Sequence, residues 1–460
     1  MLRFINIIDK TLKINKEFFK LFFKLFGFSL VISIILYLLN YIYFPSNSVF
    51  FNEDGSSYCL EISKFGLDIF NLDFEYIYPE SCDQERYYSV FSSPVNLIST
   101  QHPYQTRPVF VIFIYLINSI IKAFVYDNPI FSLQISTLIG HSLILSLGTS
   151  IILNTFKKLS DLKFYEKLIL HSLILFSPLI KYALFDPSHQ TITYLNIAIM
   201  AYVIKSYGSI NFSKFSMIIG ILFLAHRPFL LVFVIYFFYL TKFKVNLNNI
   251  LLGIKGSIYV LTPYIVYRFM ILSFGYEVYD GLTKKWGQFI WILDFLRGRV
   301  KYESDWHCVT VPENFICYID DTFNSLLFLL IPVLTVATMF LTKKFSTNIE
   351  SVFLKSGLYY YLFWSLIGWY PPLRFNLYSL NYLFILLLFI GYMQTENSME
   401  KYLLISSNFV FFISSSHWNN PDILTINYIS RISYSLFGLY FVCVLINYFR
   451  KTFDRDTGKP

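Results

Sequence analysis

Long apolar runs recur along the whole chain, and polar connections separate them. The first run covers residues 19–43, which are mostly aliphatic and aromatic. An α-helix needs about 20 apolar residues to cross the hydrocarbon core of a bilayer. We therefore predict an all-α polytopic membrane protein with about 12 transmembrane helices. We expect one membrane domain over residues 1–460.

Composition supports this class. Hydrophobic residues make up 55% of the 460 positions and charged residues 14%, whereas soluble domains carry roughly 25% charged residues. The mean hydropathy is +0.53. The net charge of +8 is attributed to cytoplasmic connections, so we expect no nucleic-acid partner.

The basic residues predict an orientation. One short connection carries Lys157, Lys158, Lys163 and Lys167, and both ends of the chain are also basic. Lys and Arg concentrate on the cytoplasmic side of membrane proteins. Both termini are therefore expected in the cytoplasm of a multi-pass cell membrane, with two large extracytoplasmic loops at residues 44–107 and 274–321. Residues 108–125 are expected to form a juxtamembrane or re-entrant helix, because a crossing there would place the basic connection outside.

Four of the five cysteines lie in the two predicted outer loops. Cys59 and Cys82 belong to the first loop, and Cys308 and Cys317 to the second. An oxidising exterior would favour one disulfide bond in each loop. Chance placement gives the same distribution, so the sequence leaves both readings open.

An acidic pair follows the first apolar run. Glu53 and Asp54 lie about ten residues past the predicted membrane exit, and Tyr58 follows one helical turn later. A carboxylate at the bilayer edge can accept a proton from an acceptor hydroxyl or amine. The alternative is a helix N-cap, because Asp54 also precedes a helix-like segment.

Further charged groups mark the predicted outer ends of later helices. Arginine is the side chain best suited to hold a phosphate, through its planar fork of donors. Arg268 could instead extend to the headgroups, as lysine and arginine often do near a membrane. The charged and imidazole groups at these ends are Arg107, Asp186, His189, His226, Arg227, Arg268 and Arg374.

In order and spacing, these motifs resemble the GT-C superfamily of integral-membrane glycosyltransferases, which includes protein O-mannosyltransferases and the aminoarabinose transferase of lipid A. The resemblance spans roughly residues 19–390. It rests on five segments, namely Glu53-Asp54 with Tyr58, His102 to Pro108, Asp186-Pro187, Gly220 to Pro228, and Pro372 to Tyr378.

The resemblance implies inverting transfer of a sugar from a polyprenyl-phosphate-linked donor at the extracytoplasmic face, in a bacterial inner membrane. It assigns the catalytic carboxylates to Asp54, as general base, with Glu53 and Asp186, and the donor phosphate to Arg107, Arg227 and Arg374. Contacts to acceptor or donor would come from Tyr58, His102, His189 and His226. A divalent metal ion is the one cofactor it allows, although no His/Asp cluster has convincing ligand spacing. The acceptor, a glycan, lipid or protein, stays open.

Two other functions fit the same pattern. An O-antigen polymerase or ligase also has many helices, outer arginines and a large loop late in the chain, here residues 274–321. A transporter of lipid-linked saccharides is the third reading. Against a transporter, the charges gather at the outer rim and few lie near the bilayer midplane, where transport sites usually lie.

Overall fold

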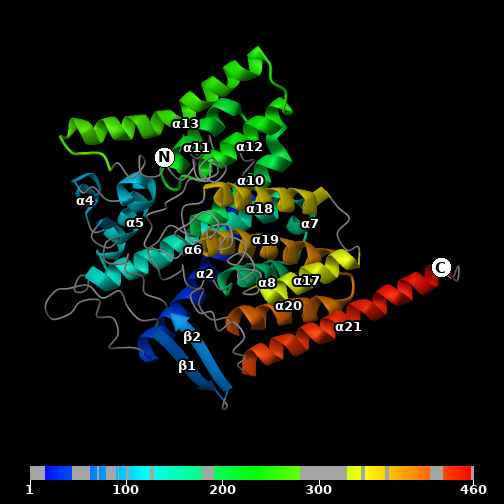
Figure 1. Cartoon of the computed structure of the whole chain (residues 1–460). Coiled ribbons are helices and arrows are strands. Elements are labelled where there is room, and N and C mark those ends of the chain that lie inside the picture. The colour runs from blue at the N-terminus through cyan, green and yellow to red at the C-terminus, as the bar shows by residue number, and fades with distance from the viewer. Residues whose placement is uncertain are drawn as a thin grey trace, which may run out of the picture. The chain divides into compact units, whose positions relative to one another are not determined.

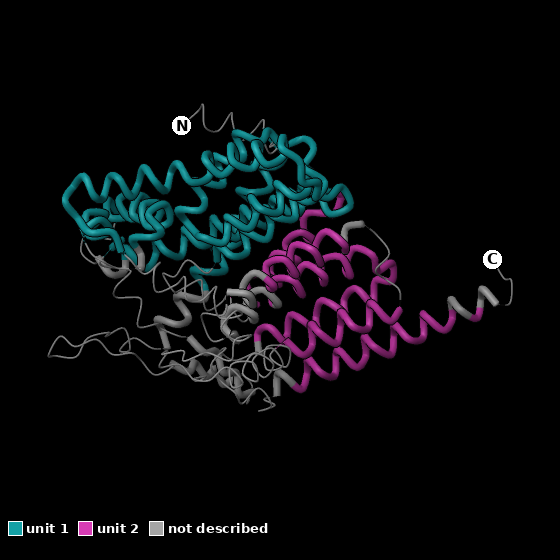
Figure 2. The backbone as a smooth tube through the Cα atoms, turned by 45° about the horizontal axis from the view of Figure 1, so that its top comes forward, with its two compact units in different colours: residues 1–61, 80–160, 183–288 teal, residues 62–79, 161–182, 289–460 magenta. Residues whose placement is uncertain are grey.

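The computed structural model describes most of the predicted helices (Figure 1). It describes residues 16–43, 63–69, 72–78, 90–91, 93–99, 103–124, 129–177, 180, 191–279, 329–342, 348–367, 372–414 and 428–456. The chain divides into two compact units (Figure 2). Unit 1 comprises residues 1–61, 80–160 and 183–288, and unit 2 comprises residues 62–79, 161–182 and 289–460.

The described part of unit 1 is helical. Its elements are α2 (Lys16–Tyr43), α4 (Pro94–Ser99), η1 (Pro103–Thr106), α5 (Pro108–Ile121), α6 (Pro129–Thr155), α7 (Lys157–Ser160), α10 (Ile192–Ser206), η3 (Tyr207–Ser209), α11 (Phe212–Phe223), α12 (Phe229–Thr241) and α13 (Leu247–Ser273).

The described part of unit 2 contains six helices and one hairpin. The helices are α8 (Phe164–Leu175), α17 (Leu330–Leu341), α18 (Asn348–Ile367), α19 (Pro372–Gln394), α20 (Ser398–Ser414) and α21 (Tyr428–Asp456). The hairpin pairs β1 (Ser63–Ile69) with β2 (Leu72–Tyr78) in antiparallel register, Ser63 opposite Tyr78 and Ile69 opposite Leu72.

Four described helices contain a stretch that is long and apolar enough to cross a membrane, namely Lys16–Ile35, Ser132–Thr155, Leu247–Ser273 and Arg431–Arg450. Five more apolar helices have 10–17 residues. The helical, membrane-type character of the chain is therefore supported, whereas about 12 crossings remain a prediction. The all-α prediction needs one correction, because the first predicted outer loop contains the β1–β2 hairpin.

Helix α5 occupies most of the segment for which a re-entrant or juxtamembrane helix is predicted. Its 14 residues span about 21 Å at 1.5 Å per residue, which is less than the ~30 Å hydrocarbon core. The re-entrant or juxtamembrane placement of this helix stays a prediction. Asn118 of α5 accepts hydrogen bonds from Ser132 and Ser136 of α6, at 2.6 and 3.4 Å.

Small residues and hydroxyls pack the membrane helices together. Ser29 and Ser33 of α2 lie 3.0 and 3.4 Å from Ser146 and Ser142 of α6, hydroxyl to hydroxyl. Lipid tails are as apolar as leucine, so helices in a bilayer rely on such close packing and on interhelical hydrogen bonds.

Buried polar side chains also hold unit 2 together. The Tyr392 hydroxyl of α19 donates to Glu166 Oε1 of α8 at 3.1 Å. Asn447 of α21 donates to Oε1 of Glu400, a buried residue of α20, and these two helices lie side by side (Figure 1). Each pairing satisfies a polar group that would be costly to bury alone.

Gly220 fixes the distance between α11 and α13. A Cβ at this position would lie 2.6 Å from the Val260 carbonyl oxygen and 3.0 Å from that of Tyr259. We predict that Gly220→Leu lowers stability by about 1–3 kcal/mol or more, because overpacking a close helix contact displaces backbone. Thermal unfolding of the purified protein measures this. Gly27→Leu on α2 is the matched control, since a Cβ at Gly27 meets no atom within 4 Å. Equal effects of the two substitutions would contradict the prediction.

Candidate phosphate-binding site

In unit 1, the N-terminal ends of α5 and α12 lie near the C-terminal ends of α11 and α13. The Val109 amide of α5 donates to the Leu224 carbonyl at the end of α11, at 3.3 Å. Gln105 is 3% exposed, and its Nε2 donates to the carbonyl oxygens of Ile98 and Glu277, both at 3.2 Å. Its Oε1 accepts the Tyr279 amide at 2.5 Å. One buried amide side chain therefore ties η1 to the nearby helix α4 and to the distant segment that follows α13.

Three arginines gather where these segments meet. Arg107 is the N-cap residue of α5, ahead of Pro108. Arg227 lies in the turn between α11 and α12, and Arg268 lies in the last part of α13. The pKa of Arg227 is lowered to about 10, chiefly by burial and also by the charges of Arg107 and Arg268. Arg107 and Arg268 therefore each lie close enough to Arg227 for their charges to act on its guanidinium group.

Arg227 carries the clearest sign of an incomplete site. Its Nη2 atom is buried and has no hydrogen-bond partner in the part of the chain that the structure describes. The groups that influence its pKa are two arginines and two tyrosines, Tyr264 and Tyr279. A buried cationic donor without an acceptor is costly, so an anion at this position would satisfy it.

Aromatic rings support the cluster from α11 and α13. The Arg268 Cζ atom lies 5.5 Å from the ring centroid of Tyr264, a cation–π arrangement. Tyr264 in turn meets Phe223 edge to face, with ring centroids 5.7 Å apart. These contacts hold the Arg268 side chain against α13, near Arg227.

His226 lies next to Arg227 in the turn between α11 and α12. It is 2% exposed, its Nε2 lies 3.4 Å from Thr193 Oγ1, and its ring meets Phe229 edge to face. Burial, followed by the charge of Arg107, lowers the pKa of His226 well below its ordinary 6.5. His226 is therefore a neutral imidazole that supports the turn.

A second buried histidine lies at the same end of α10. His141 Nδ1 of α6 lies 2.6 Å from Thr191 Oγ1, and the His141 ring packs 6.0 Å from Phe110, centroid to centroid. Thr191 and Thr193 thus each hold a buried imidazole. This end of α10 follows directly on the segment that contains Asp186 and His189.

Because folded His226 is neutral, the stability of the folded chain should fall at acid pH. The unfolded chain takes up a proton below about pH 6.5, whereas the folded chain does not, so stability falls with pH below that value. The loss is about 1.4 kcal/mol per pH unit for one such group. His226→Gln should reduce the acid slope by this amount and leave stability above pH 7 nearly pH-independent. Thermal unfolding between pH 5 and 7.5 tests the prediction, and an unchanged acid slope would refute it.

The structure brings together three of the residues predicted from sequence, Arg107, His226 and Arg227. Arg374 lies in the first turn of α19 in unit 2, and its side chain is outside the described residues. Ten other candidates also lie outside them, so their roles and both disulfide bonds stay predictions: Glu53, Asp54, Tyr58, Cys59, Cys82, His102, Asp186, His189, Cys308 and Cys317.

Sequence reasoning did not assign four members of the site: Gln105, Tyr264, Arg268 and Tyr279. The Tyr264/Arg268 pair has the i, i+4 spacing that places two side chains on one helix face, which is a usable signal. The Gln105 side chain accepts a hydrogen bond from the backbone of Tyr279, 174 positions away. A local sequence pattern cannot predict such a contact.

The described residues contain no group of three or more His, Cys, Asp or Glu side chains that could hold a metal ion. No protein-family model, curated protein or solved structure matches this chain. The proposed chemistry therefore depends on the chain's own residues.

Proposed function

We propose that this chain is an integral-membrane glycosyltransferase of the GT-C type. It moves a sugar from a polyprenyl-phosphate-linked donor to an acceptor at the extracytoplasmic membrane face, with inversion at the anomeric carbon. The observation that carries the proposal is the group of Arg107, Arg227 and Arg268, with a buried guanidinium nitrogen of Arg227 that has no hydrogen-bond partner among the described residues.

A phosphate group suits this cluster by charge and by geometry. Guanidinium groups bind phosphate through paired, charge-assisted hydrogen bonds. Three cations held in one place repel one another, and a bound phosphate would offset that repulsion. Gln105 fixes the backbone near Arg107, and Tyr264 supports Arg268, so the cluster is held ready for its ligand.

The location of the cluster agrees with the predicted membrane side. It lies where α11 ends, α12 begins and α13 ends. Lys242 and Lys244 lie between the C-terminal end of α12 and the N-terminal end of α13, at the ends of these helices that are far from the cluster. Lysines favour the cytoplasmic side. The cluster would therefore face outward, where a polyprenyl-linked donor presents its sugar.

In the proposed reaction, Asp54 accepts the proton of the acceptor nucleophile. The nucleophile attacks the anomeric carbon on the face opposite the phosphate, and the bond from that carbon to the phosphate oxygen breaks. The electron pair leaves with the polyprenyl phosphate, and the arginines stabilise its added negative charge, as preorganised charges do in comparable reactions. Glu53 and Asp186 are proposed to position acceptor or donor. Arg374, which the resemblance assigns to the donor phosphate, lies in unit 2, and its role stays a prediction.

Conversion of a labelled donor tests the proposal. Membranes that contain the protein, and matched membranes that lack it, receive a panel of polyprenyl-phosphate sugars with radiolabelled sugar. A transferase releases polyprenyl phosphate and moves the label to an acceptor. A transporter relocates the intact donor without conversion, and a polymerase or ligase acts on oligosaccharide pyrophosphate lipids instead. Either of these outcomes would overturn the proposal.

A further inference from the structure

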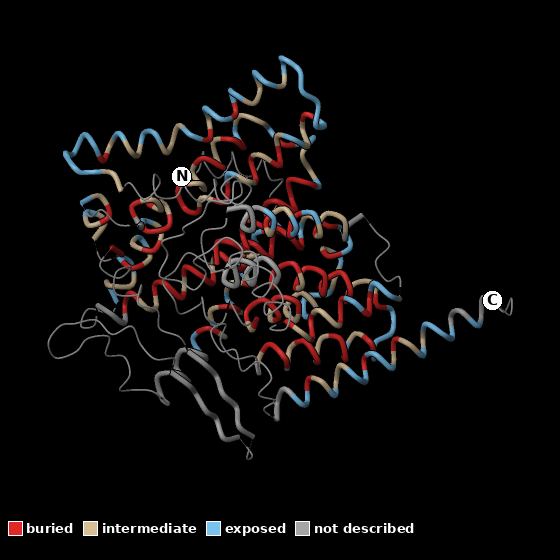
Figure 3. The backbone as a smooth tube through the Cα atoms, in the orientation of Figure 1, coloured by how far each residue is buried: buried red, intermediate tan, exposed pale blue. Residues whose placement is uncertain are grey.

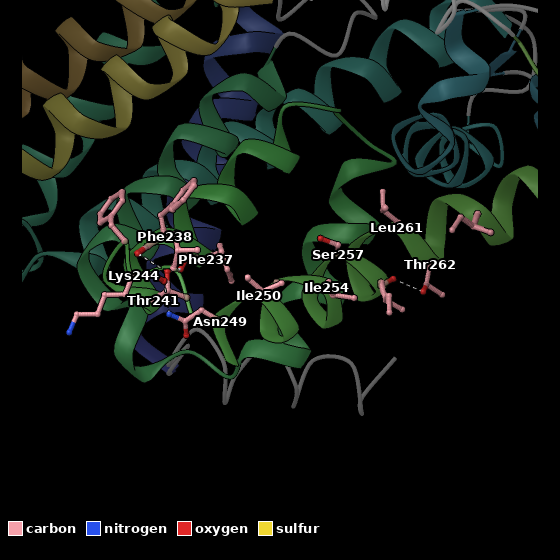
Figure 4. Close-up of a pocket in the computed structure, with 15 residues that line it drawn as sticks. Phe237, Phe238, Thr241, Lys244, Asn249, Ile250, Ile254, Ser257, Leu261 and Thr262 are labelled. Carbon is pink, nitrogen blue, oxygen red and sulfur yellow. Dashed lines mark hydrogen bonds between the residues drawn. The ribbon is translucent and has the colours of Figure 1, made fainter. Parts of the chain in front are cut away.

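An open apolar groove runs between α12 and α13 in unit 1 (Figure 4). Its volume is about 570 Å³. Phe237, Phe238 and Phe243 form one wall, and a row of α13 side chains forms the other. Lys244 and Asn249 close the end where α12 finishes and α13 begins, which is opposite to the arginine cluster.

The α13 wall is a continuous exposed stripe. Its large members are Ile250, Ile254, Ile258, Leu261 and Ile265, which are 37–60% exposed. Their spacing of three or four residues places them on one helix face. The stripe is about 22 Å long at 1.5 Å per residue, so it covers most of the ~30 Å hydrocarbon core. The exposure of α13 is visible in Figure 3.

The Lys244 end is shaped by a strained turn. Lys242 and Phe243 have φ angles of 52° and 58°, in the left-handed region that non-glycine residues seldom occupy. The turn stacks Phe243 on Phe238, with ring centroids 5.4 Å apart and planes at 8°. Asn249 Nδ2 donates to the Lys244 carbonyl at 2.7 Å. Backbone strain of this kind often marks a site with a function.

We propose that the groove binds a hydrocarbon chain of an anionic phospholipid, with the phosphate against Lys244. The groove supplies a long apolar surface and a cation at one end, which matches the chemistry of such a lipid. By the predicted orientation this end faces the cytoplasmic leaflet, which carries anionic lipids. The proposal rests on the predicted membrane placement and is independent of the glycosyltransferase proposal.

Native mass spectrometry of the full-length protein in detergent tests the site, with phosphatidylglycerol and phosphatidylcholine of identical chains as probes. The wild type should retain phosphatidylglycerol in preference. Lys244→Gln should reduce that preference about fivefold, the effect of one lysine near an anionic surface. Lys255→Gln is the matched control, because Lys255 is exposed on the same helix but does not line the groove. Ser257→Trp, which fills the groove from an exposed position, should reduce binding of both lipids.

Four results would overturn the proposal. Equal retention of the two lipids by the wild type would mean non-specific lipid contact. A preference that survives Lys244→Gln would place the headgroup elsewhere. Loss of polyprenyl-phosphate binding in Ser257→Trp, with unchanged phospholipid binding, would assign the groove to the tail of the donor. Conversion of a dimer to a monomer by Ser257→Trp, again with unchanged phospholipid binding, would assign the groove to a second copy of the chain.

Discussion

Arg227→Gln should weaken binding of a polyprenyl-phosphate donor by about ten- to hundredfold, which corresponds to the loss of one charge-assisted hydrogen-bonded contact. The expectation follows from the buried Nη2 atom of Arg227, which has no partner in the described part of the chain. Glutamine keeps a donor in the turn but removes the positive charge and the second donor of the fork. Equilibrium binding to the purified protein, with a fluorescent polyprenyl-phosphate sugar, measures the effect.

Two further variants make this measurement specific. Arg227→Lys keeps the charge without the planar fork, so its affinity should lie between those of the wild type and Arg227→Gln. Arg431→Gln removes an exposed arginine at the start of α21 and should leave donor binding unchanged. Wild-type affinity in Arg227→Gln would remove Arg227 from the site.

Asp54→Asn should reduce turnover by about 10²- to 10⁴-fold, the usual contribution of a general base, while donor binding stays at the wild-type level. Asparagine has nearly the shape of aspartate but cannot accept the proton. The motivation is the position of Asp54 just past the first apolar run, in the acidic-pair-plus-tyrosine setting of the GT-C resemblance. Turnover is measured with a saturating donor, so that a loss in rate is separated from a loss in binding.

Asp68→Asn is the matched control for Asp54→Asn. Asp68 is a carboxylate of the same predicted outer loop, on β1, and no catalytic role is assigned to it. Its variant should retain full turnover. If Asp54→Asn also retained full turnover, the general base would lie elsewhere, and a polymerase- or ligase-type enzyme would become the better reading of the sequence.

The helices could be predicted from sequence because the apolar runs are long. The run at residues 19–43 corresponds to α2, Lys16–Tyr43, since length and composition decide whether a segment suits a bilayer. The β1–β2 hairpin was missed although its strands alternate, with Phe65, Leu67 and Ile69 at every second position. This alternation has a period of two, which is the main sequence signal for a strand.

The site could be predicted only in part. Arg107 and Arg227 each precede a proline at the start of a helix, so their unusual placement was visible in the chain. Arg268 has no such mark, and membrane-facing arginines commonly extend to headgroups. Arg268 is brought near Arg227 by the contact between α11 and α13 at Gly220 and by the hydrogen bond from Gln105 to the Glu277 carbonyl. Both are tertiary contacts, which local sequence patterns do not encode.

Headgroup discrimination by the wild-type protein is the most direct test of the central claim, that the arginine cluster binds the phosphate of a polyprenyl carrier. Polyprenyl phosphate and neutral polyprenol of the same length compete against a labelled polyprenyl-phosphate sugar on the purified protein. If two or more guanidinium groups of the cluster contact its phosphate, polyprenyl phosphate should compete at least about tenfold better. Equal competition by polyprenol would show that the tail alone determines binding, and it would contradict the account.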